Sequence, residues 1–192
     1  WGGGDREGVY TQMATHLKID PRNFLQAKNR YGMEDAFSGV CAELLATLEE
    51  GEIEPIYDAV LIDEAQDLPS SFFQLVYHFT RSPKHIIWAY DELQRLSETS
   101  MPSTDELFGR NRQGRPRVQL QNAEGQPRQD IILPVCYRNT PWALTLAHAL
   151  GFGIYRNEGL VQHFDEAELW REIGYEVVDG QQRLQAIFEF CS

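Results

Sequence analysis

The chain has 192 residues and carries 17 basic and 29 acidic side chains, so its formal net charge is −12. Its hydrophobic content of 42% is enough for a buried core, and its charged fraction of 24% is that of a folded protein, which excludes a wholly disordered chain. The longest apolar stretches span about half a dozen residues, whereas a bilayer requires roughly 20, so we expect no membrane-spanning segment.

Other features of the sequence bear on the compartment and the extent of the chain. No basic segment followed by an apolar one opens the sequence, so we expect no secretion signal. The odd, widely separated cysteines Cys41, Cys136 and Cys191 predict a reducing, cytoplasmic location and no structural metal site. The acidic balance excludes a protein whose whole surface coats nucleic acid. Because Trp1 and not Met stands first, we expect a segment of a longer protein.

The first predicted element is a helix over residues 33–48. Apolar residues recur there at spacings of three and four, which predicts one buried stripe, and Gly51 would end the helix. The predicted stripe consists of Met33, Ala36, Phe37, Val40, Cys41, Leu44, Leu45 and Leu48.

A strand, a helix and a second strand are predicted next. The run over residues 56–62 ends in consecutive apolar residues, which is typical of a strand buried on both faces, as in a parallel sheet. The apolar spacing between Pro69 and Pro83 predicts a helix that ends before the second proline, and residues 85–90 predict another strand. This order is the βαβ unit of an α/β domain.

From residue 97 to about residue 130 the periodicity is lost, which marks a boundary between two units. Short strands are predicted over 117–120 and 130–133, around a turn at Gly125. The stretch 108–130 holds five arginines and two acids, a balance of +3 in an otherwise acidic chain. It is interpreted either as a surface that contacts a phosphate backbone or a partner domain, or as a solvated loop.

Beyond this boundary, Thr140 and Pro141 are a good N-cap and first residue for a helix over 142–150, which Gly151 would end. The remaining apolar segments, between residues 169 and 190, resemble the beginning of a second domain. We therefore predict one unit over 1–107, a connecting loop or hairpin over 108–130 and the start of another unit over 131–192.

Two acidic residues, Asp63 and Glu64, directly follow the first strand of the predicted βαβ unit. Open α/β sheets bind ligands at the carboxyl ends of their strands. Nucleotide hydrolysis needs one carboxylate that holds Mg²⁺, usually through water, and a neighbouring one that orients or deprotonates the attacking water. An acidic surface loop is the alternative for an isolated pair, but the pentapeptide Asp63-Glu64-Ala65-Gln66-Asp67 after an apolar strand favours nucleotide chemistry.

The string from Val60 to Asp67 resembles motif II, the Walker B element, of superfamily 1 DNA helicases of the UvrD/Rep type. Residues 90–94, Tyr-Asp-Glu-Leu-Gln, resemble motif III of that family, and residues 133–139, Leu-Pro-Val-Cys-Tyr-Arg-Asn, resemble motif IV. The resemblance implies a partial RecA-like P-loop NTPase fold. In it, 1–107 would end the first RecA-like domain and 131–192 would begin the second.

The resemblance also implies ATP and Mg²⁺ as cofactors and single-stranded DNA as the partner. Asp63 would coordinate the magnesium ion, and Glu64 would be the base that positions water. Gln94 would sense the γ-phosphate, Tyr137 would stack on the adenine, and Arg138 would reach the γ-phosphate as an arginine finger, a role that suits its planar, permanently charged guanidinium.

The sequence contains no Gly-x-x-x-x-Gly-Lys-Ser/Thr phosphate-binding loop. We expect that loop to lie upstream in a longer parent protein, and we expect the isolated 192-residue chain to be inactive. The alternative is a degenerate RecA-like domain that acts as a nucleotide-independent protein or DNA interaction module.

Overall fold

The chain divides into two compact units, Trp1–Gln119 and Leu120–Ser192. The division falls inside 108–130, the predicted connecting segment, while the domain assignment on either side of it stays a prediction. The computed structural model describes residues 7–48, 53–91, 101–123, 125–131, 140, 143, 146–147, 150, 175–177 and 184–186.

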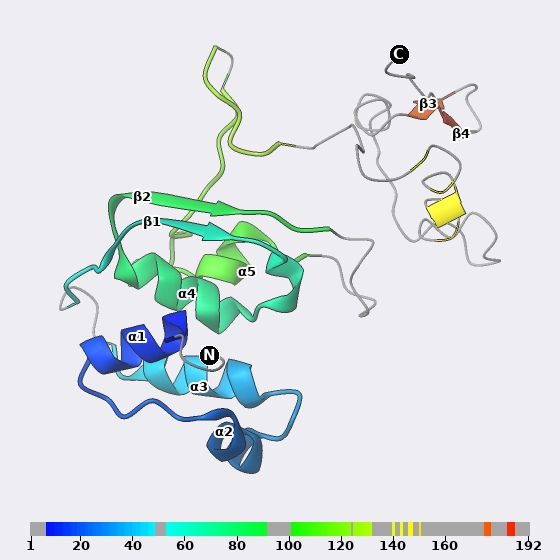
Figure 1. The fold of residues 1–192 in the computed structure, drawn as a ribbon. Helices are drawn as coiled ribbons and strands as arrows, with labels where there is room; N and C mark the ends of the chain where they lie inside the picture. Colours follow the sequence, from blue (N-terminus) through cyan, green and yellow to red (C-terminus); the bar gives the residue numbers. More distant parts are fainter. Residues whose placement is uncertain are drawn as a thin grey trace. The chain divides into compact units, whose positions relative to one another are not determined.

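The first unit is an α/β structure with a two-stranded parallel sheet (Figure 1). Strand β1 spans Tyr57–Ile62, helix α4 spans Ser70–Phe79 and strand β2 spans Thr80–Trp88. The strands pair in parallel, with Ala59 opposite His85. The predicted order of strand, helix and strand is therefore confirmed.

Strand β2 begins five residues earlier than the sequence predicts. Thr80 directly follows α4, is already extended with φ −91° and ψ 137°, and pairs with Tyr57. The register then shifts before Ala59 pairs with His85, so the strand contains an irregular stretch between its two paired parts. Apolar periodicity did not reveal this first part of β2, because its side chains are mostly polar.

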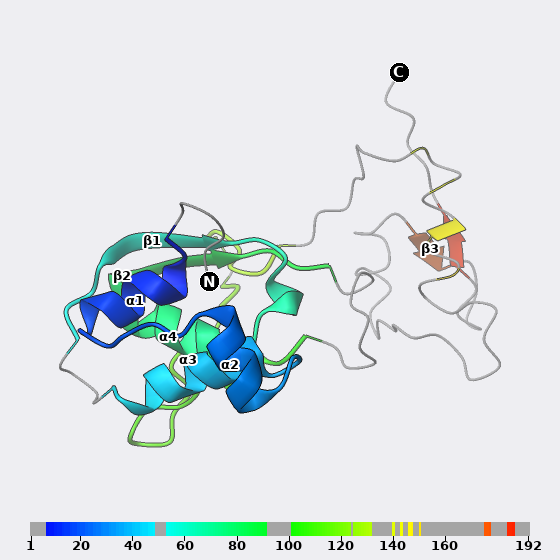
Figure 2. The same ribbon diagram turned by 60° about the horizontal axis from the view of Figure 1, so that its bottom comes forward.

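The two faces of this sheet have different surroundings. Ile62 is only 7% exposed, whereas Leu61 and its cross-strand partner Ile87 are 77% and 65% exposed. The helices of the first unit lie on one side of its sheet (Figures 1 and 2), and no described element of that unit covers the other side. The prediction of a strand buried on both faces is therefore wrong, because such burial requires helices on both sides.

Three helices precede the sheet in the chain: α1 spans Val9–His16, α2 spans Phe24–Tyr31 and α3 spans Ala36–Ala46. Helix α3 is the helix predicted over 33–48, and it is shorter than expected. Met33 precedes it and is 68% exposed, so its assignment to the buried stripe is wrong, and Gly51 lies outside the described residues. The fully buried residues of α3 are Ala36, Val40, Cys41 and Leu44.

Apolar periodicity did not predict α1, α2 or the five-residue helix α5 (Thr104–Phe108). Capping residues mark two of these helices in the sequence. The Asn23 side chain accepts the Gln26 N–H at 2.9 Å, and the Gln26 side chain accepts the Asn23 N–H at 2.9 Å, so the two form a capping box at α2. Ser103 and Glu106 form the same arrangement at α5. A search for this spacing would have placed both helix starts.

Helices α2 and α3 are held together by Glu43. Its carboxylate accepts hydrogen bonds from the Arg22 guanidinium at 2.7 and 2.8 Å and from the Tyr31 hydroxyl at 2.7 Å. The Tyr31 ring packs against Gly39, where a Cβ atom would stand 2.3 Å from Cγ of the ring. The hydrogen bonds from Arg22 and Tyr31 lower the pKa of Glu43 to about 2.

The Glu43→Gln variant is expected to be less stable than the wild type at neutral pH, with a difference that disappears in acid. A carboxyl group whose pKa falls from 4.5 to about 2 on folding stabilises the fold above pH 4.5, and this contribution is lost as the pH falls toward 2. Because the Glu43 side chain is 35% exposed, solvent screens the pair, and we expect a difference of about 1 kcal/mol.

Urea unfolding at several pH values measures this difference between wild type and variant. Glu34→Gln, the same change at an exposed glutamate just before α3, is the control and should shift the free energy of unfolding by less than about 0.5 kcal/mol. A difference for Glu43→Gln that does not change with pH would contradict the role of the ion pair.

The strand predicted over 117–120 is absent. The loop that follows α5 is closed instead by an isolated antiparallel bridge between Arg110 and Pro116, and the Asn111 side chain accepts two backbone N–H groups inside this turn. An asparagine side chain, and not strand pairing, therefore shapes the segment. Of the strand predicted over 130–133, residues 130 and 131 are described and do not form a strand, and residues 132 and 133 lie outside the described residues.

In the second unit the structure describes an antiparallel pair, β3 (Tyr175–Val177) with β4 (Leu184–Ala186). The described positions within the predicted helix 142–150 are helical, namely 143, 146, 147 and 150. Gly151 and most of the predicted tail lie outside the described residues. Among the helices that the structure describes, none has the length and apolar character that a membrane crossing requires.

Candidate functional site

The predicted acidic pair lies where strand β1 ends. The Ile62 carbonyl accepts the Ala89 N–H at 2.8 Å, and the Ala89 carbonyl accepts the Ala65 N–H at 2.9 Å, so the backbone ladder continues past the end of β1. Between these two anchor points, Asp63 and Glu64 are exposed to solvent. The sheet therefore fixes the backbone on both sides of the pair, while both carboxylates stay accessible to water and to a ligand.

The backbone of Glu64 is left-handed, with φ 49° and ψ 45°. This conformation is uncommon for a residue with a side chain and costs about 1–2 kcal/mol. Two local contacts accompany it: Asp63 Oδ1 accepts the Glu64 N–H at 3.0 Å, and the Glu64 carbonyl accepts the Asp67 N–H at 3.0 Å. The second contact belongs to the 3₁₀ helix η1 (Ala65–Asp67), which turns the chain toward α4. Strained residues of this kind cluster at functional sites.

The strain predicts that Glu64→Gly is more stable than Glu64→Ala, although both variants lose the same carboxylate. Glycine adopts positive φ without a steric penalty, so we expect a difference of about 1 kcal/mol in the free energy of unfolding. Urea unfolding of the 192-residue chain measures it. Glu54, at the other end of β1, is the matched control, because its φ is not positive and Glu54→Ala should be at least as stable as Glu54→Gly. Equal stability of the two variants at position 64 would show that the backbone there is not strained.

A residue that sequence reasoning did not single out, Gln66, joins the site. Its side chain is 7% exposed and reaches in two directions. Nε2 donates to Glu64 Oε2 at 2.6 Å, and Oε1 accepts the backbone N–H of Asp91 at 3.1 Å. The sequence could have indicated Gln66, because it lies inside the same pentapeptide that identified Asp63 and Glu64.

The carboxylates suit a magnesium ion. Mg²⁺ prefers oxygen ligands and is usually bound by one or two carboxylates, with the remaining positions taken by water and by substrate phosphates. Solvent-exposed Asp63 provides one such carboxylate, and the exposed Glu64 carboxylate stands next to it in the chain. Within the described part of the chain, no three His, Cys, Asp or Glu side chains come together as a complete metal cage. An exposed carboxylate of this kind fits an ion whose other positions are taken by water and phosphate.

Three other predicted site residues, Gln94, Tyr137 and Arg138, lie outside the described residues. The structure brings Asp63 and Glu64 together with Gln66 and with the backbone of Asp91, which belongs to the segment that resembles motif III. The ends of the two parallel strands thus form one connected group.

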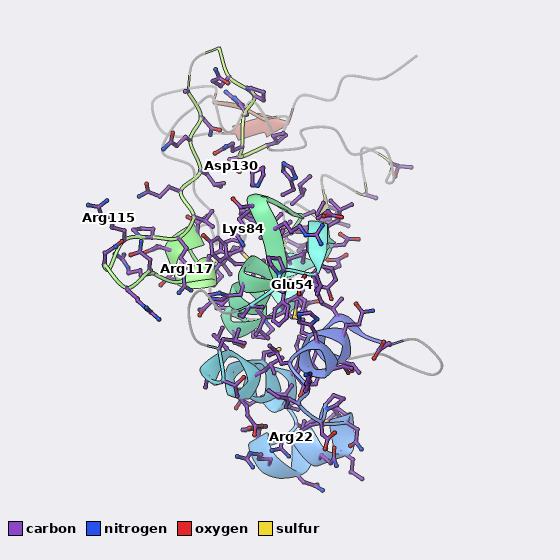
Figure 3. All side chains as sticks on the ribbon, turned by 90° about the vertical axis from the view of Figure 1, so that its left-hand side faces the viewer. Arg22, Glu54, Lys84, Arg115, Arg117 and Asp130 are labelled. Atoms are coloured by element: carbon purple, nitrogen blue, oxygen red, sulfur yellow. The ribbon has the colours of Figure 1, made fainter. Side chains whose placement is uncertain are left out.

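Two of the arginines in the loop after α5 make contacts within the first unit. Arg110 pairs with Asp105 and also donates to the Gly114 carbonyl at 3.1 Å. The Arg117 guanidinium lies 5.9 Å from the ring centroid of Tyr77 and 3.2 Å from Nε2 of His78. Figure 3 labels Arg117 and its neighbour Arg115 on this loop. Part of the basic character of this loop therefore stabilises the fold.

Comparisons with protein-family models, with curated proteins and with solved structures find no match for this chain.

Proposed function

We propose that this chain is part of a superfamily 1 ATP-dependent DNA helicase or translocase, and that it contains the end of one RecA-like domain and the beginning of the next. One observation carries the proposal. Asp63 and Glu64 are adjacent and exposed at the carboxyl end of β1, in a parallel βαβ unit, where α/β proteins bind their ligands. The resemblance of 60–67, 90–94 and 133–139 to helicase motifs in the family's order supports it.

In this proposal each carboxylate has its own role. Asp63 would hold a magnesium ion, directly or through water, and the ion would supply positive charge beside the phosphates of ATP. Glu64 accepts a hydrogen bond from the attacking water, orients it toward the γ-phosphate and takes its proton.

The remaining roles belong to residues carried over from the resemblance. Gln94 senses the γ-phosphate, Tyr137 stacks on the adenine, and Arg138 stabilises the charge that develops on the transferred phosphoryl group. An arginine finger of this kind accelerates hydrolysis by roughly 10³- to 10⁵-fold. Opening and closing of the site during each cycle would move the protein along single-stranded DNA.

The test is an ATPase assay of the full-length parent protein with and without single-stranded DNA. We expect magnesium-dependent turnover that the DNA stimulates, together with a Gly-x-x-x-x-Gly-Lys-Ser/Thr loop upstream in the parent reading frame. The isolated 192-residue chain should bind ATP poorly and hydrolyse none. Turnover by the isolated chain would contradict the proposal that the phosphate-binding loop lies upstream in the parent protein. A parent without turnover would contradict the proposed function itself.

One observation favours a second candidate, a nucleotide-independent protein or DNA interaction module. The 192 residues contain no phosphate-binding loop. A module of this kind has no need for a strained glutamate beside an aspartate, which argues for the enzyme. A parent reading frame without a phosphate-binding loop, combined with a partner or DNA that binds equally well with and without ATP, would favour the module.

A further inference from the structure

We propose that Gln66 is a positioning residue that ties the Glu64 carboxylate to the chain at Asp91, so that the segment after β2 controls the hydrolytic base. The inference rests on the proposed function, because it assigns a partner to the base of that same site. Gln66 itself has none of the roles that the resemblance to helicase motifs implies.

The chemistry of the two contacts requires an amide at position 66. The Glu64 carboxylate only accepts hydrogen bonds, and the backbone N–H of Asp91 only donates one. Glutamine offers both a donor and an acceptor. Its Nε2 therefore faces Glu64, and its Oε1 faces the Asp91 N–H. Glutamate would keep the acceptor for Asp91 but would repel Glu64, and an apolar side chain would lose both bonds.

The surroundings hold Gln66 in place. Its side chain is 7% exposed, and the preceding Ala65 is fully buried and donates its N–H to the Ala89 carbonyl at 2.9 Å. A buried amide that lost its partners would leave polar atoms unsatisfied, so the bridge is strongly favoured over other rotamers. Glu64, in contrast, is exposed, and within the described residues its carboxylate accepts a hydrogen bond from Gln66 only. Gln66 is therefore what restricts the rotamers of the base.

The bridge also connects two parts of the chain that are 25 residues apart in sequence. Asp91 follows β2 and begins the stretch that leads to Gln94. A displacement of the Asp91 backbone by about 1 Å would break its hydrogen bond to Gln66 and release Glu64, and misplacement on this scale lowers turnover by roughly 10²-fold. The geometry thus couples the position of the Glu64 carboxylate to that of the Asp91 backbone.

Two variants of Gln66 separate the two hydrogen bonds. Gln66→Met has a similar volume and loses both bonds, whereas Gln66→Glu keeps the acceptor for the Asp91 N–H and loses the donor to Glu64. Gln113→Met, the same chemical change at an exposed position in the loop after α5, is the matched control. Thermal unfolding of all three variants of the 192-residue chain checks that each one folds.

The first measurement is amide hydrogen exchange of the 192-residue chain, followed residue by residue by NMR. Gln66→Met should speed exchange of the Asp91 N–H at least about tenfold while leaving the Ala65 N–H in the ladder unchanged. Gln66→Glu and Gln113→Met should leave Asp91 as slow as in the wild type. Unchanged exchange at Asp91 in Gln66→Met would overturn the bridge, whatever the enzyme does.

The second measurement is ATP turnover of the full-length parent. Both Gln66 variants should lower kcat by about 10- to 100-fold with little change in KM for ATP, because the base is misplaced and nucleotide contacts are kept. A normal kcat in variants whose Asp91 exchange behaves as expected would overturn the positioning role. A wild-type parent with no ATP turnover would overturn the proposed function and this role together, and the exchange result would still show whether the bridge exists.

Discussion

The Glu64→Gln variant of the full-length protein is expected to hydrolyse ATP about 10² to 10⁴ times more slowly than the wild type. Its affinity for the nucleotide should be nearly unchanged. Glutamine has the shape of glutamate and keeps an oxygen that can accept the hydrogen bond from Gln66, so the site should keep its geometry. It lacks the negative charge and the proton affinity that the proposed mechanism requires of the base, so the loss should fall on the chemical step.

Steady-state turnover and equilibrium binding of a fluorescent ATP analogue measure the two quantities separately. Glu54→Gln is the matched control, since Glu54 is exposed before the opposite end of β1 and is labelled in Figure 3. It should hydrolyse ATP at the wild-type rate. Normal turnover by Glu64→Gln would remove Glu64 from the proposed role, and parallel losses of turnover and binding would point to a ligand-holding role instead.

The Phe108→Ala variant is expected to lower the free energy of unfolding by about 3–5 kcal/mol. Phe108 is fully buried, and its ring lies 5.3 Å from the ring of Trp88 and 5.7 Å from that of Phe73, measured between centroids and with edge-to-face geometry. These partners belong to β2 and α4, so Phe108 attaches α5 to both elements. Truncation would remove the aromatic contacts and leave a cavity at this junction.

Urea unfolding of the 192-residue chain measures the loss. Phe24→Ala removes the same atoms from a residue that is 49% exposed and should cost less than about 1 kcal/mol. Because small domains are stable by only about 5–15 kcal/mol, the Phe108 variant should unfold far more easily than this control. Similar losses for the two variants would mean that α5 is not anchored through Phe108.

The parts of the fold that apolar periodicity predicted are those with long apolar patterns. The strand at 56–62 and the helix between Pro69 and Pro83 each contain enough apolar residues in a regular order to be identified as β1 and α4. Helix α2 is short and mostly polar and has a single buried residue, Ala27, so it offers too few apolar residues for periodicity to identify, and its capping box marks it instead. Leu61 illustrates another limit, since an apolar side chain does not reveal whether a second layer covers it.

The candidate site also contains residues that the sequence could predict and residues that it could not. Asp63 and Glu64 were predictable because their residue types follow a strand in a recognisable order. The role of Gln66 was not, because it depends on Asp91 lying beside the end of β1, and only the parallel pairing of β1 and β2 brings the two together. The left-handed backbone at Glu64 was also not predictable, since no glycine marks the turn.

The strained backbone at Glu64 has a consequence for the evolution of related sequences. A lineage released from selection for the carboxylate should accept glycine at this position more readily than any other residue that lacks the carboxylate, because glycine relieves the strain. A lineage that still depends on the carboxylate must keep the glutamate in spite of the strained backbone. The residue at position 64 in homologues would therefore report, without any assay, whether selection still maintains the acid.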